Sequence, residues 1–526
     1  MMAKKFLCVL AVLCLAFALA SCGGGNVKVD MDTTGSAVAS NGGALVETGD
    51  YVYFINGVES YSTAYKTGEV VKGALARVKK SDVADPEGKS EIVVSKLLVS
   101  GDKTAGVYIY GDYVYYAVPS EEKDSKGSVK NDKLNFFRTK LDGTSTSSKI
   151  ANVDFANDAT FRYLKSGDKV YLAVYSESLY VYDAESCKQV YSYEKTIDEV
   201  LFDDNGTSDS VYFTVKPVNT NLYDEDSSEA RQVSYQDVHK VVFGNEVKDE
   251  IVLSGAGKYI VTADKDIGKE LSGDGEGFTG VTIDLLKHKD GVLYFSYTSL
   301  DTTVGGTFYV ALDDDKIASD SKETWANAKN AIINYGNKNA SSIFGSSSYI
   351  LSKDCIIFVD STYGILKYDF NARNDENTDF GVKTLYYSET AKTANILSVN
   401  GDYLYFTESN NVYRVNIKEE NAKEVRLNKI SIDTSWYAPE AFTVGGNDYV
   451  AVVYSDSNYR SYVYLINATE TEKDYNAASD EDKETFYEFE ATSETVKAVA
   501  KTMLGQMSES DASAFETYLE SFEVSE

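Results

Sequence analysis

The chain has 526 residues, of which 43% are hydrophobic, 13% aromatic and 25% charged, and its formal net charge is −31. This composition is typical of a folded globular chain and argues against a disordered tail. The strong negative charge, without any cluster of Lys and Arg, excludes a nucleic-acid-binding surface.

The N-terminus has the pattern of an export signal. Lys4 and Lys5 precede an apolar run over residues 6–20 that contains no charged side chain. The run is shorter than the roughly 20 residues that a membrane-spanning helix needs. We therefore expect residues 1–21 to be a signal peptide that is removed.

The end of this run reads Leu19-Ala20-Ser21-Cys22, followed by three glycines. It resembles the lipobox of bacterial lipoproteins, and the resemblance implies that Cys22 becomes diacylated and is then the new N-terminus. Residues 22–40 would be a flexible tether. We expect a lipid-anchored protein of the cell membrane that lies on the extracytoplasmic face, and the membrane is its first expected partner.

One short unit recurs along the chain, in which Gly, Asp or Asn precedes an aromatic and β-branched stretch. The stretch from 402 to 408 alternates with period two and is apolar on both faces, which predicts a strand covered on both sides. The eight copies begin at Gly49, Gly111, Gly167, Asp209, Asp290, Asp354, Gly401 and Asn447.

Most copies are followed by a second strand-like stretch that ends at a turn, so each unit is expected to be an antiparallel meander. Their spacing fits four-stranded propeller blades, which bury their faces only against neighbouring blades. We predict an all-β fold, a β-propeller of eight blades over residues 41–475, with seven blades as the alternative. A pair of open sandwiches or a β-solenoid would also use such repeats. The pattern resembles the YWTD-like and tryptophan-docking-like propeller lipoproteins, many of which have no assigned function.

Two segments depart from the repeat. Residues 316–340 are expected to contain a helical insertion between blades, with Trp325, Ala328, Ile332 and Ile333 on one face. Residues 476–526 are acidic and have helical periodicity, so we expect a helical C-terminal extension that packs on its own domain.

Few residues offer catalytic or metal-binding chemistry. The only histidines, His239 and His288, are expected on the surface or in edge strands, and no Cys-x-x-Cys is present. Cys187 and Cys355 each lie in an apolar run and are expected to be buried, although their pairing is left open. We therefore predict no catalytic constellation, no metal and no cofactor.

Several other patterns are attributed to loops. The G-x-G-x-x-G match at 275–280 precedes a strand-like run, whereas a dinucleotide site must open a helix. Alternating acids at 264–266, 313–315 and 375–379 lack a complete calcium loop and are expected to belong to turns.

The most distinctive binding candidate is the loop that carries Trp436 and Tyr437 beside acidic residues. An exposed aromatic pair is a plausible platform for a sugar ring or a peptide, with packing between blades as the alternative. The leading hypothesis is a non-enzymatic, anchored propeller that binds a protein, peptide or glycan. The alternatives are an envelope-assembly scaffold and a propeller glycosidase or lyase that uses paired carboxylates.

Overall fold

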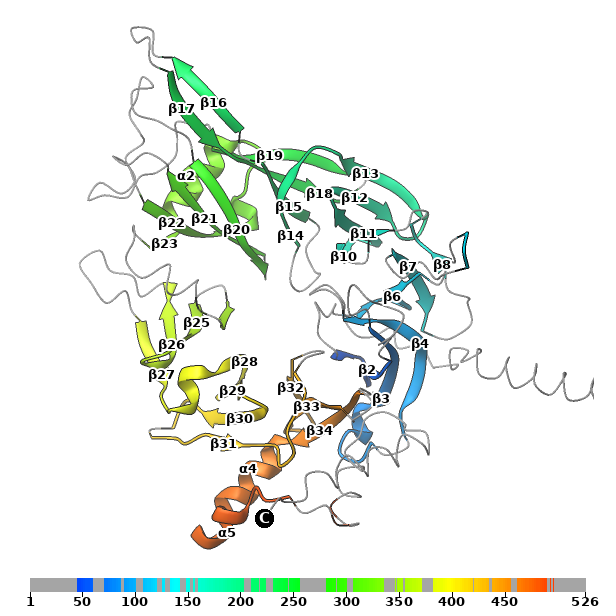
Figure 1. Cartoon of the computed structure of the whole chain (residues 1–526), viewed down its shortest axis with the longest axis vertical. Helices are drawn as coiled ribbons and strands as arrows, with labels where there is room; N and C mark the ends of the chain where they lie inside the picture. The colour runs from blue at the N-terminus through cyan, green and yellow to red at the C-terminus, as the bar shows by residue number, and fades with distance from the viewer. Residues whose placement is uncertain are drawn as a thin grey trace, which may run out of the picture.

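In a computed structural model, the chain forms a ring of antiparallel sheets, the blades, which we number 1 to 8 in chain order (Figure 1). The eight-bladed, all-β prediction is confirmed. The structure describes residues 45–59, 71–86, 89–100, 107–120, 125–127, 133–141, 148–151, 155–156, 159–202, 210–216, 218–223, 230–244, 246–255, 281–289, 291–299, 306–334, 346, 348–352, 355–370, 382–419, 421–434, 438–455, 461–489, 492 and 495.

The first four blades follow one another as meanders, each with its first strand on the inner side of the ring (Figure 1). Their strands are, for blade 1, β1 (Leu45–Thr48), β2 (Tyr51–Glu59), β3 (Val71–Lys79) and β4 (Glu91–Ser100); for blade 2, β5 (Tyr108–Tyr110), β6 (Tyr113–Pro119), β7 (Lys133–Lys140) and β8 (Ser148–Lys149), with β9 (Phe155–Ala156) beside β7; for blade 3, β10 (Thr160–Ser166), β11 (Lys169–Ser176), β12 (Ser178–Asp183) and β13 (Lys188–Tyr193); and for blade 4, β14 (Ile197–Leu201), β15 (Ser210–Val215), β18 (Asp237–Val242) and β19 (Lys248–Ser254), with an inserted hairpin of β16 (Val218–Tyr223) and β17 (Ala230–Tyr235).

The last four blades continue the same pattern, except that blade 8 has three strands among the described residues. Their strands are, for blade 5, β20 (Val281–Lys289), β21 (Val292–Ser299), β22 (Gly306–Asp313) and β23 (Ile332–Asn334); for blade 6, β24 (Tyr349–Leu351), β25 (Cys355–Asp360), β26 (Gly364–Asp369) and β27 (Val382–Tyr386); for blade 7, β28 (Asn395–Asn400), β29 (Tyr403–Glu408), β30 (Asn411–Asn416) and β31 (Val425–Arg426); and for blade 8, β32 (Glu440–Val444), β33 (Asn447–Ser455) and β34 (Ser461–Asn467).

The recurring sequence unit is the turn into the second strand of each blade. In blade 7, Asn400 pairs with Tyr403 across Gly401 and Asp402, and Gly401 has a φ of +58°. Glycine adopts this left-handed conformation without the steric cost that a side chain adds. The alternating apolar residues of β29 are then buried on both faces of the sheet, as the sequence predicted.

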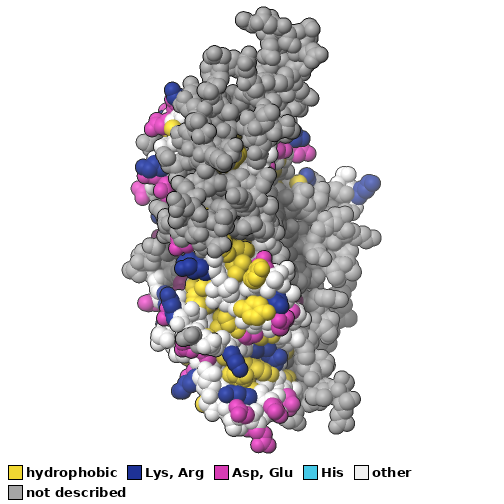
Figure 2. All heavy atoms as spheres, turned by 90° about the vertical axis from the view of Figure 1, so that its left-hand side faces the viewer, with side chains coloured by type: hydrophobic (Ala, Val, Ile, Leu, Met, Phe, Trp, Pro, Cys, Tyr) yellow, Lys and Arg dark blue, Asp and Glu magenta, His cyan; other side chains and the backbone are white. Residues whose placement is uncertain are grey.

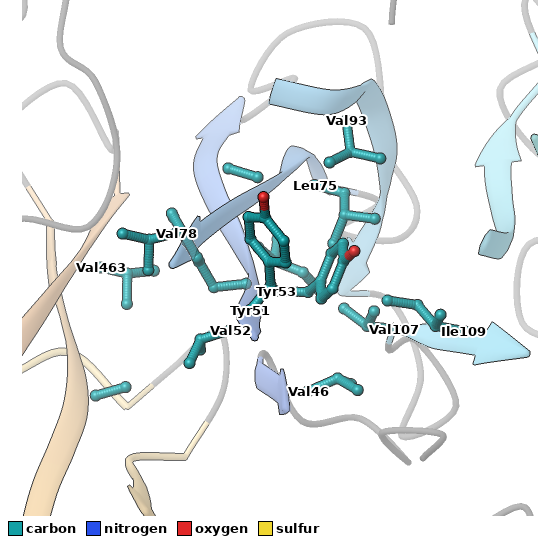
Figure 3. Packing of buried hydrophobic residues seen from close by; sticks show 14 of the residues in the cluster. Val46, Tyr51, Val52, Tyr53, Leu75, Val78, Val93, Val107, Ile109 and Val463 are labelled. Atoms are coloured by element: carbon teal, nitrogen blue, oxygen red, sulfur yellow. The ribbon is translucent and has the colours of Figure 1, made fainter. Parts of the chain in front are cut away.

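The core consists of apolar layers between neighbouring blades. Each of the seven clusters joins residues of adjacent blades, and the largest joins blades 8, 1 and 2, so the layers continue around the whole ring. Figure 3 shows Val463 of β34 beside Val78 of β3, with Val107, which precedes β5, and Ile109 of β5 on the other side of blade 1. A blade alone would expose both of its apolar faces, so closure into a ring buries what the repeats would otherwise expose.

Tyrosine hydroxyls join successive blades. The third residue of the second strand is Tyr in every blade except blade 6, where it is Ile357. Four of these hydroxyls donate a hydrogen bond to the next blade: Tyr171 to Gly244 O (2.9 Å), Tyr212 to Asp314 Oδ1 (2.8 Å), Tyr294 to Ser352 O (2.6 Å) and Tyr405 to Asp448 Oδ2 (2.9 Å).

The two ends of the propeller therefore differ. One end, which we call the hairpin end, carries the turns between first and second strands and between third and fourth strands, and all four tyrosine bonds lie there. The opposite end, the connection end, carries the turns between second and third strands and the links from one blade to the next.

The helix predicted at 316–340 lies at a different place in the fold from the one expected. Helix α2 (Ser321–Asn330) lies between β22 and β23 of one sheet, so the prediction of an insertion between blades was wrong. Trp325 and Ala328 are buried as expected, but the chain leaves the helix after Asn330, and Ile332 and Ile333 belong to β23. The described residues also form the short 3-10 helices η1 (Lys80–Asp82), η2 (Asp314–Lys316) and η4 (Thr390–Thr393).

The C-terminal extension begins with α4 (Ala468–Ala477) and α5 (Asp480–Thr485). Ala468 and Phe489 pack on the cluster between blades 7 and 8, while the apolar stripes predicted beyond 495 lie outside the described residues. In the described part of the chain, no helix has the length and hydropathy to cross a bilayer.

The two described cysteines do not form a disulfide. Cys187 lies in the turn between β12 and β13, with a φ of +58°, so its predicted place in an apolar strand was wrong. Cys355 begins β25, three blades away in the ring, and both side chains are half-buried.

Candidate functional site

The residues singled out for binding and anchoring lie outside the described part of the chain. These are Trp436 and Tyr437 in the link between blades 7 and 8, Cys22 in the N-terminal segment, and the loops at 264–266, 275–280 and 375–379. The described strands on either side of Trp436, β31 and β32, show that its link leaves and enters the propeller at the connection end.

His288 is fully buried, so the expectation of a surface position was wrong, but the edge-strand expectation is confirmed, because β20 is the first strand of its sheet. It lies on β20, and its Nε2 is 2.9 Å from Asp314 Oδ2, while Tyr212 of blade 4 donates to the other carboxylate oxygen. Burial alone would raise the pKa of Asp314, but the hydrogen bonds from His288 and Tyr212 hold it below its usual value. The group therefore joins blades 4 and 5.

His239 has the same kind of hydrogen-bond partners, at the interface between blades 3 and 4. Its Nδ1 is 2.8 Å from Asp249 Oδ1, and Tyr191 of blade 3 donates to Asp249 Oδ2 at 2.8 Å. The ring stacks on Phe213, with centroids 4.6 Å apart, and β18 is an interior strand, so the edge-strand expectation was wrong for His239. In both groups the carboxylate accepts from a histidine of its own blade and a tyrosine of the preceding blade.

Three carboxylates belong to the first strands of blades 4 and 5: Asp198 and Glu199 lie on β14, and Asp284 lies on β20. Burial raises the pKa of Glu199, and the negative charges of Asp284 and Asp198 raise it further. Each acid already accepts a hydrogen bond from the protein: Asp198 from Gln236 Nε2 (2.8 Å), Glu199 from the Leu285 amide (2.9 Å) and Asp284 from Ser296 Oγ (3.3 Å).

The bonds of Asp198 and Glu199 join β14 to the segments beside it, and the bond of Asp284 joins β20 to β21 within blade 5, so all three acids have structural roles. The described residues contain no group of three or more His, Cys, Asp or Glu side chains placed to hold a metal ion. Neither histidine has a serine or cysteine among its described hydrogen-bond partners. We therefore place the candidate site elsewhere.

The strongest candidate is a pair of exposed tyrosines on blade 6, which we call the tyrosine platform: Tyr363 and Tyr387. Their exposed fractions, 61% and 54%, are the largest of any large hydrophobic side chain described. Tyr363 lies in the turn between β25 and β26, and Tyr387 follows β27, so both lie at the connection end.

The backbone around the platform is held in place by short contacts. The carboxylate of Asp360 accepts hydrogen bonds from the amides of Thr362 (2.7 Å) and Tyr363 (2.9 Å), which fixes the turn. Gly364 has a φ of +77°, and a Cβ there would lie 2.7 Å from Tyr386 O and 3.2 Å from Tyr387 Cα. The close approach of Gly364 to Tyr386 and Tyr387 places the backbone of Tyr363, the preceding residue, near that of Tyr387.

A paired charge borders the platform. Lys392 Nζ lies 2.9 Å from Glu389 Oε1 and 5.3 Å from the centroid of the Tyr387 ring. The hydrogen bond and charge of Lys392 lower the pKa of Glu389, and the carboxylate raises the pKa of Lys392, so both remain charged near neutral pH. Figure 2, which faces the side of the ring formed by blades 6 and 7, shows hydrophobic side chains grouped with Lys and Arg.

The sequence interpretation missed the platform because tyrosine is abundant in this chain as a strand residue. Two signals mark these positions. Tyr363 follows an Asp-Ser-Thr turn, and Tyr387 follows the last residue of a strand and precedes Ser-Glu-Thr. Both fall outside the alternation that buries the other tyrosines.

Comparisons with known proteins assign this chain to no family. No protein-family model and no curated protein matches the sequence. Among solved structures, dipeptidyl peptidase 4 of Porphyromonas gingivalis has a TM-score of 0.40 and 10% identity, over 85% of this chain and 61% of that one. BamB of Moraxella catarrhalis has a TM-score of 0.33 and 12% identity, over 82% and 98%, and the computationally designed Ika8 protein has 0.36 and 8%, over 84% and 99%.

Proposed function

We propose that this protein is a non-enzymatic binding protein, anchored by lipid on Cys22 at the extracytoplasmic face of the cell membrane, whose ligand docks on the tyrosine platform. The observation that carries the proposal is the exposure of two neighbouring tyrosines on a backbone that hydrogen bonds and close packing hold still. Such side chains combine a broad apolar face with a polar tip, which suits the binding of partly polar surfaces.

The chemistry of the platform favours a glycan. The C–H face of a sugar ring can cover an exposed tyrosine, while its hydroxyls bond to neighbouring polar groups such as Thr362 and Glu389. Glu389 and Lys392 neutralise each other, so this pair does not by itself select an acidic or a basic peptide.

The proposal is tested on glycan and peptide arrays with the mature protein, unmodified and as Tyr363→Ala/Tyr387→Ala. We expect binding to a defined set of glycans and a loss of at least about tenfold in affinity in the variant, which corresponds to ~1.4 kcal/mol. The matched control is Val190→Ala/Ile251→Ala, which removes two other exposed apolar side chains, 41% and 44% exposed, from blades 3 and 4.

Each remaining outcome points to a different function. Binding to peptides alone would replace the glycan as the ligand, and equal glycan binding by both variants would remove the platform as the site. Turnover of an array sugar would favour the glycosidase alternative, and capture of a membrane assembly in cells by crosslinking would favour the scaffold.

A further inference from the structure

Three arginines are buried in the described part of the chain, and Arg162 differs from the other two in its partners. Arg77 and Arg414 are each 2% exposed, and Arg162 is 8% exposed. Arg77 Nη2 lies 2.9 Å from Glu91 Oε2. Arg414 Nε lies 3.3 Å from Glu472 Oε2. Among the described residues, no carboxylate forms an ion pair with Arg162.

The pairing of β10 with β11 shows where the guanidinium of Arg162 lies. Ser166 and Lys169 pair across a two-residue turn, so they form a hydrogen-bonded pair. Counting back by twos, the backbone of Arg162 bonds to β11, while Phe161 and Tyr163 direct their C=O groups to the other edge of β10. In the described sheet no strand pairs with that edge, which lies on the inner side of the ring (Figure 1).

Two hydrogen bonds agree with this direction. Tyr110 of blade 2 donates to Tyr163 O at 2.8 Å. Arg162 Nη1 donates to Phe161 O at 2.9 Å, so the side chain folds back over the edge of its own strand. The guanidinium therefore lies at the inner edge of blade 3.

The neighbours of the guanidinium in blades 2 and 4 are uncharged. Phe202 follows β14 of blade 4, and its ring centroid lies 5.8 Å from Arg162 Cζ. In blade 2, burial raises the pKa of Tyr108, and the charge and hydrogen bond of Arg162 offset part of that rise, so this hydroxyl remains protonated near neutral pH. Arg162 Nε has no hydrogen-bond partner among the described residues.

Arginine cannot lose its charge to avoid the cost of burial. Its pKa lies above about 12, whereas a buried lysine can become neutral. Because moving a charge out of water is strongly unfavourable, buried charges in proteins are almost always paired. The chain has 82 acidic and 51 basic residues, so carboxylates are in excess, and yet none of those described neutralises Arg162.

We propose that Arg162 binds the carboxylate group of a ligand on the inner side of the ring. A carboxylate is planar and carries one negative charge, so it can accept parallel hydrogen bonds from a guanidinium and neutralise it. A dianion such as phosphate would add a second charge to a chain whose net charge is already −31. The site lies three blades from the tyrosine platform on blade 6, so neither proposal depends on the other.

Isothermal titration calorimetry of the mature protein tests the site with acetate, glucuronate and phosphate. Acetate and glucuronate separate two sources of a carboxylate, a free organic acid and an acidic sugar, and acetamide and glucose are their neutral analogues. We expect a carboxylate to bind, its neutral analogue not to bind, and Arg162→Gln to lose at least about tenfold in affinity. The matched control is Lys165→Gln, which removes a positive charge from an exposed position on β10 and should stay within about twofold.

Three outcomes of the titrations would overturn the proposal. They are the failure of both carboxylates to bind, equal binding by Arg162→Gln and the unmodified protein, and tighter binding of phosphate than of either carboxylate. Tighter binding of glucuronate than of acetate would support an acidic sugar as the ligand, and equal binding would support a free organic acid.

The stability of the dialysed protein tests whether Arg162 is paired within the chain. Arg162→Met removes an unneutralised charge and should leave Tm within about 1 °C or raise it. Arg414→Met leaves Glu472 without its partner and should lower Tm by about 3 °C or more. An equal loss of Tm in the two variants would show that Arg162 has an internal partner and would contradict the site.

Discussion

The group formed by Tyr212, Asp314 and His288 gives the sharpest test of how the blades are joined. Asp314→Asn keeps the shape of the side chain but removes its charge. The carboxylate now accepts one hydrogen bond on each oxygen, from Tyr212 at 2.8 Å and from His288 at 2.9 Å, whereas an amide has only one oxygen that can accept. Hydrogen bonds to a charged group contribute about 1.5–3 kcal/mol, and an unsatisfied buried partner costs about 1–3 kcal/mol. Because His288 is fully buried, we expect a loss of about 3 kcal/mol.

Differential scanning calorimetry converts this loss into a temperature. The entropy of unfolding is about 2.1 cal/mol/K per residue, so a ring of roughly 430 residues that unfolds as one unit should lose about 3 °C in Tm. The matched control is Asp315→Asn, one residue along, whose side chain is 74% exposed and whose contact is Lys316 at 3.5 Å. It should change Tm by less than about 1 °C.

The pH dependence gives a second check on the same group. The pKa of Asp314 is lowered in the folded protein from the ordinary value of 3.8, so its stabilisation is present above that value and is lost as the pH falls through the folded pKa. The difference in Tm between the unmodified protein and Asp314→Asn should therefore be constant near neutral pH and shrink below about pH 4. Equal Tm values at neutral pH would refute the reasoning.

Three further outcomes follow from the same structure. Gly364→Ala should destabilise the fold by about 2–4 kcal/mol and weaken ligand binding, because the new Cβ would meet Tyr386 O at 2.7 Å. The control Gly401→Ala, at a similar φ but with no atom within 4 Å of the new Cβ, should cost about 1 kcal/mol. Equal losses of Tm in the two variants would contradict this. Tyr405→Phe should lower the unfolding midpoint in urea by the equivalent of about 1–2 kcal/mol, because it removes the bond to Asp448, and the exposed Tyr387→Phe serves as the control. Cys22→Ser should abolish labelling by radioactive palmitate and release the protein from the membrane fraction, whereas retained labelling would place the lipid elsewhere.

The repeats made the fold predictable. Each unit combines a turn that requires Gly or Asp with a strand that is apolar on both faces, and eight such strands can bury both faces only against one another. The end of α2 was not predictable from periodicity, because Ile332 and Ile333 also fit a helical face, and pairing with β22 takes them into the sheet instead. Tertiary pairing overrides local pattern at such positions.

The candidate site and the burial of the histidines were harder to predict from the sequence than the fold. His239 and His288 were expected on the surface or in edge strands, and their hydrogen-bond partners Asp249 and Asp314 come close to them only in the folded ring. Tyr363 and Tyr387 have the same side chain as the buried Tyr212 and Tyr405, and only their places at strand ends distinguish them. The partners that decide burial come from neighbouring strands and blades, which no local pattern reports.

The most direct test of the proposed binding surface is hydroxyl-radical footprinting of the mature protein with and without the glycan that the array selects. We predict that oxidation of Tyr363 and Tyr387, the most exposed large hydrophobic side chains described, falls when the glycan binds, while the exposed Val190 and Ile251 are unchanged. Protection elsewhere, with these two tyrosines oxidised as before, would contradict the account.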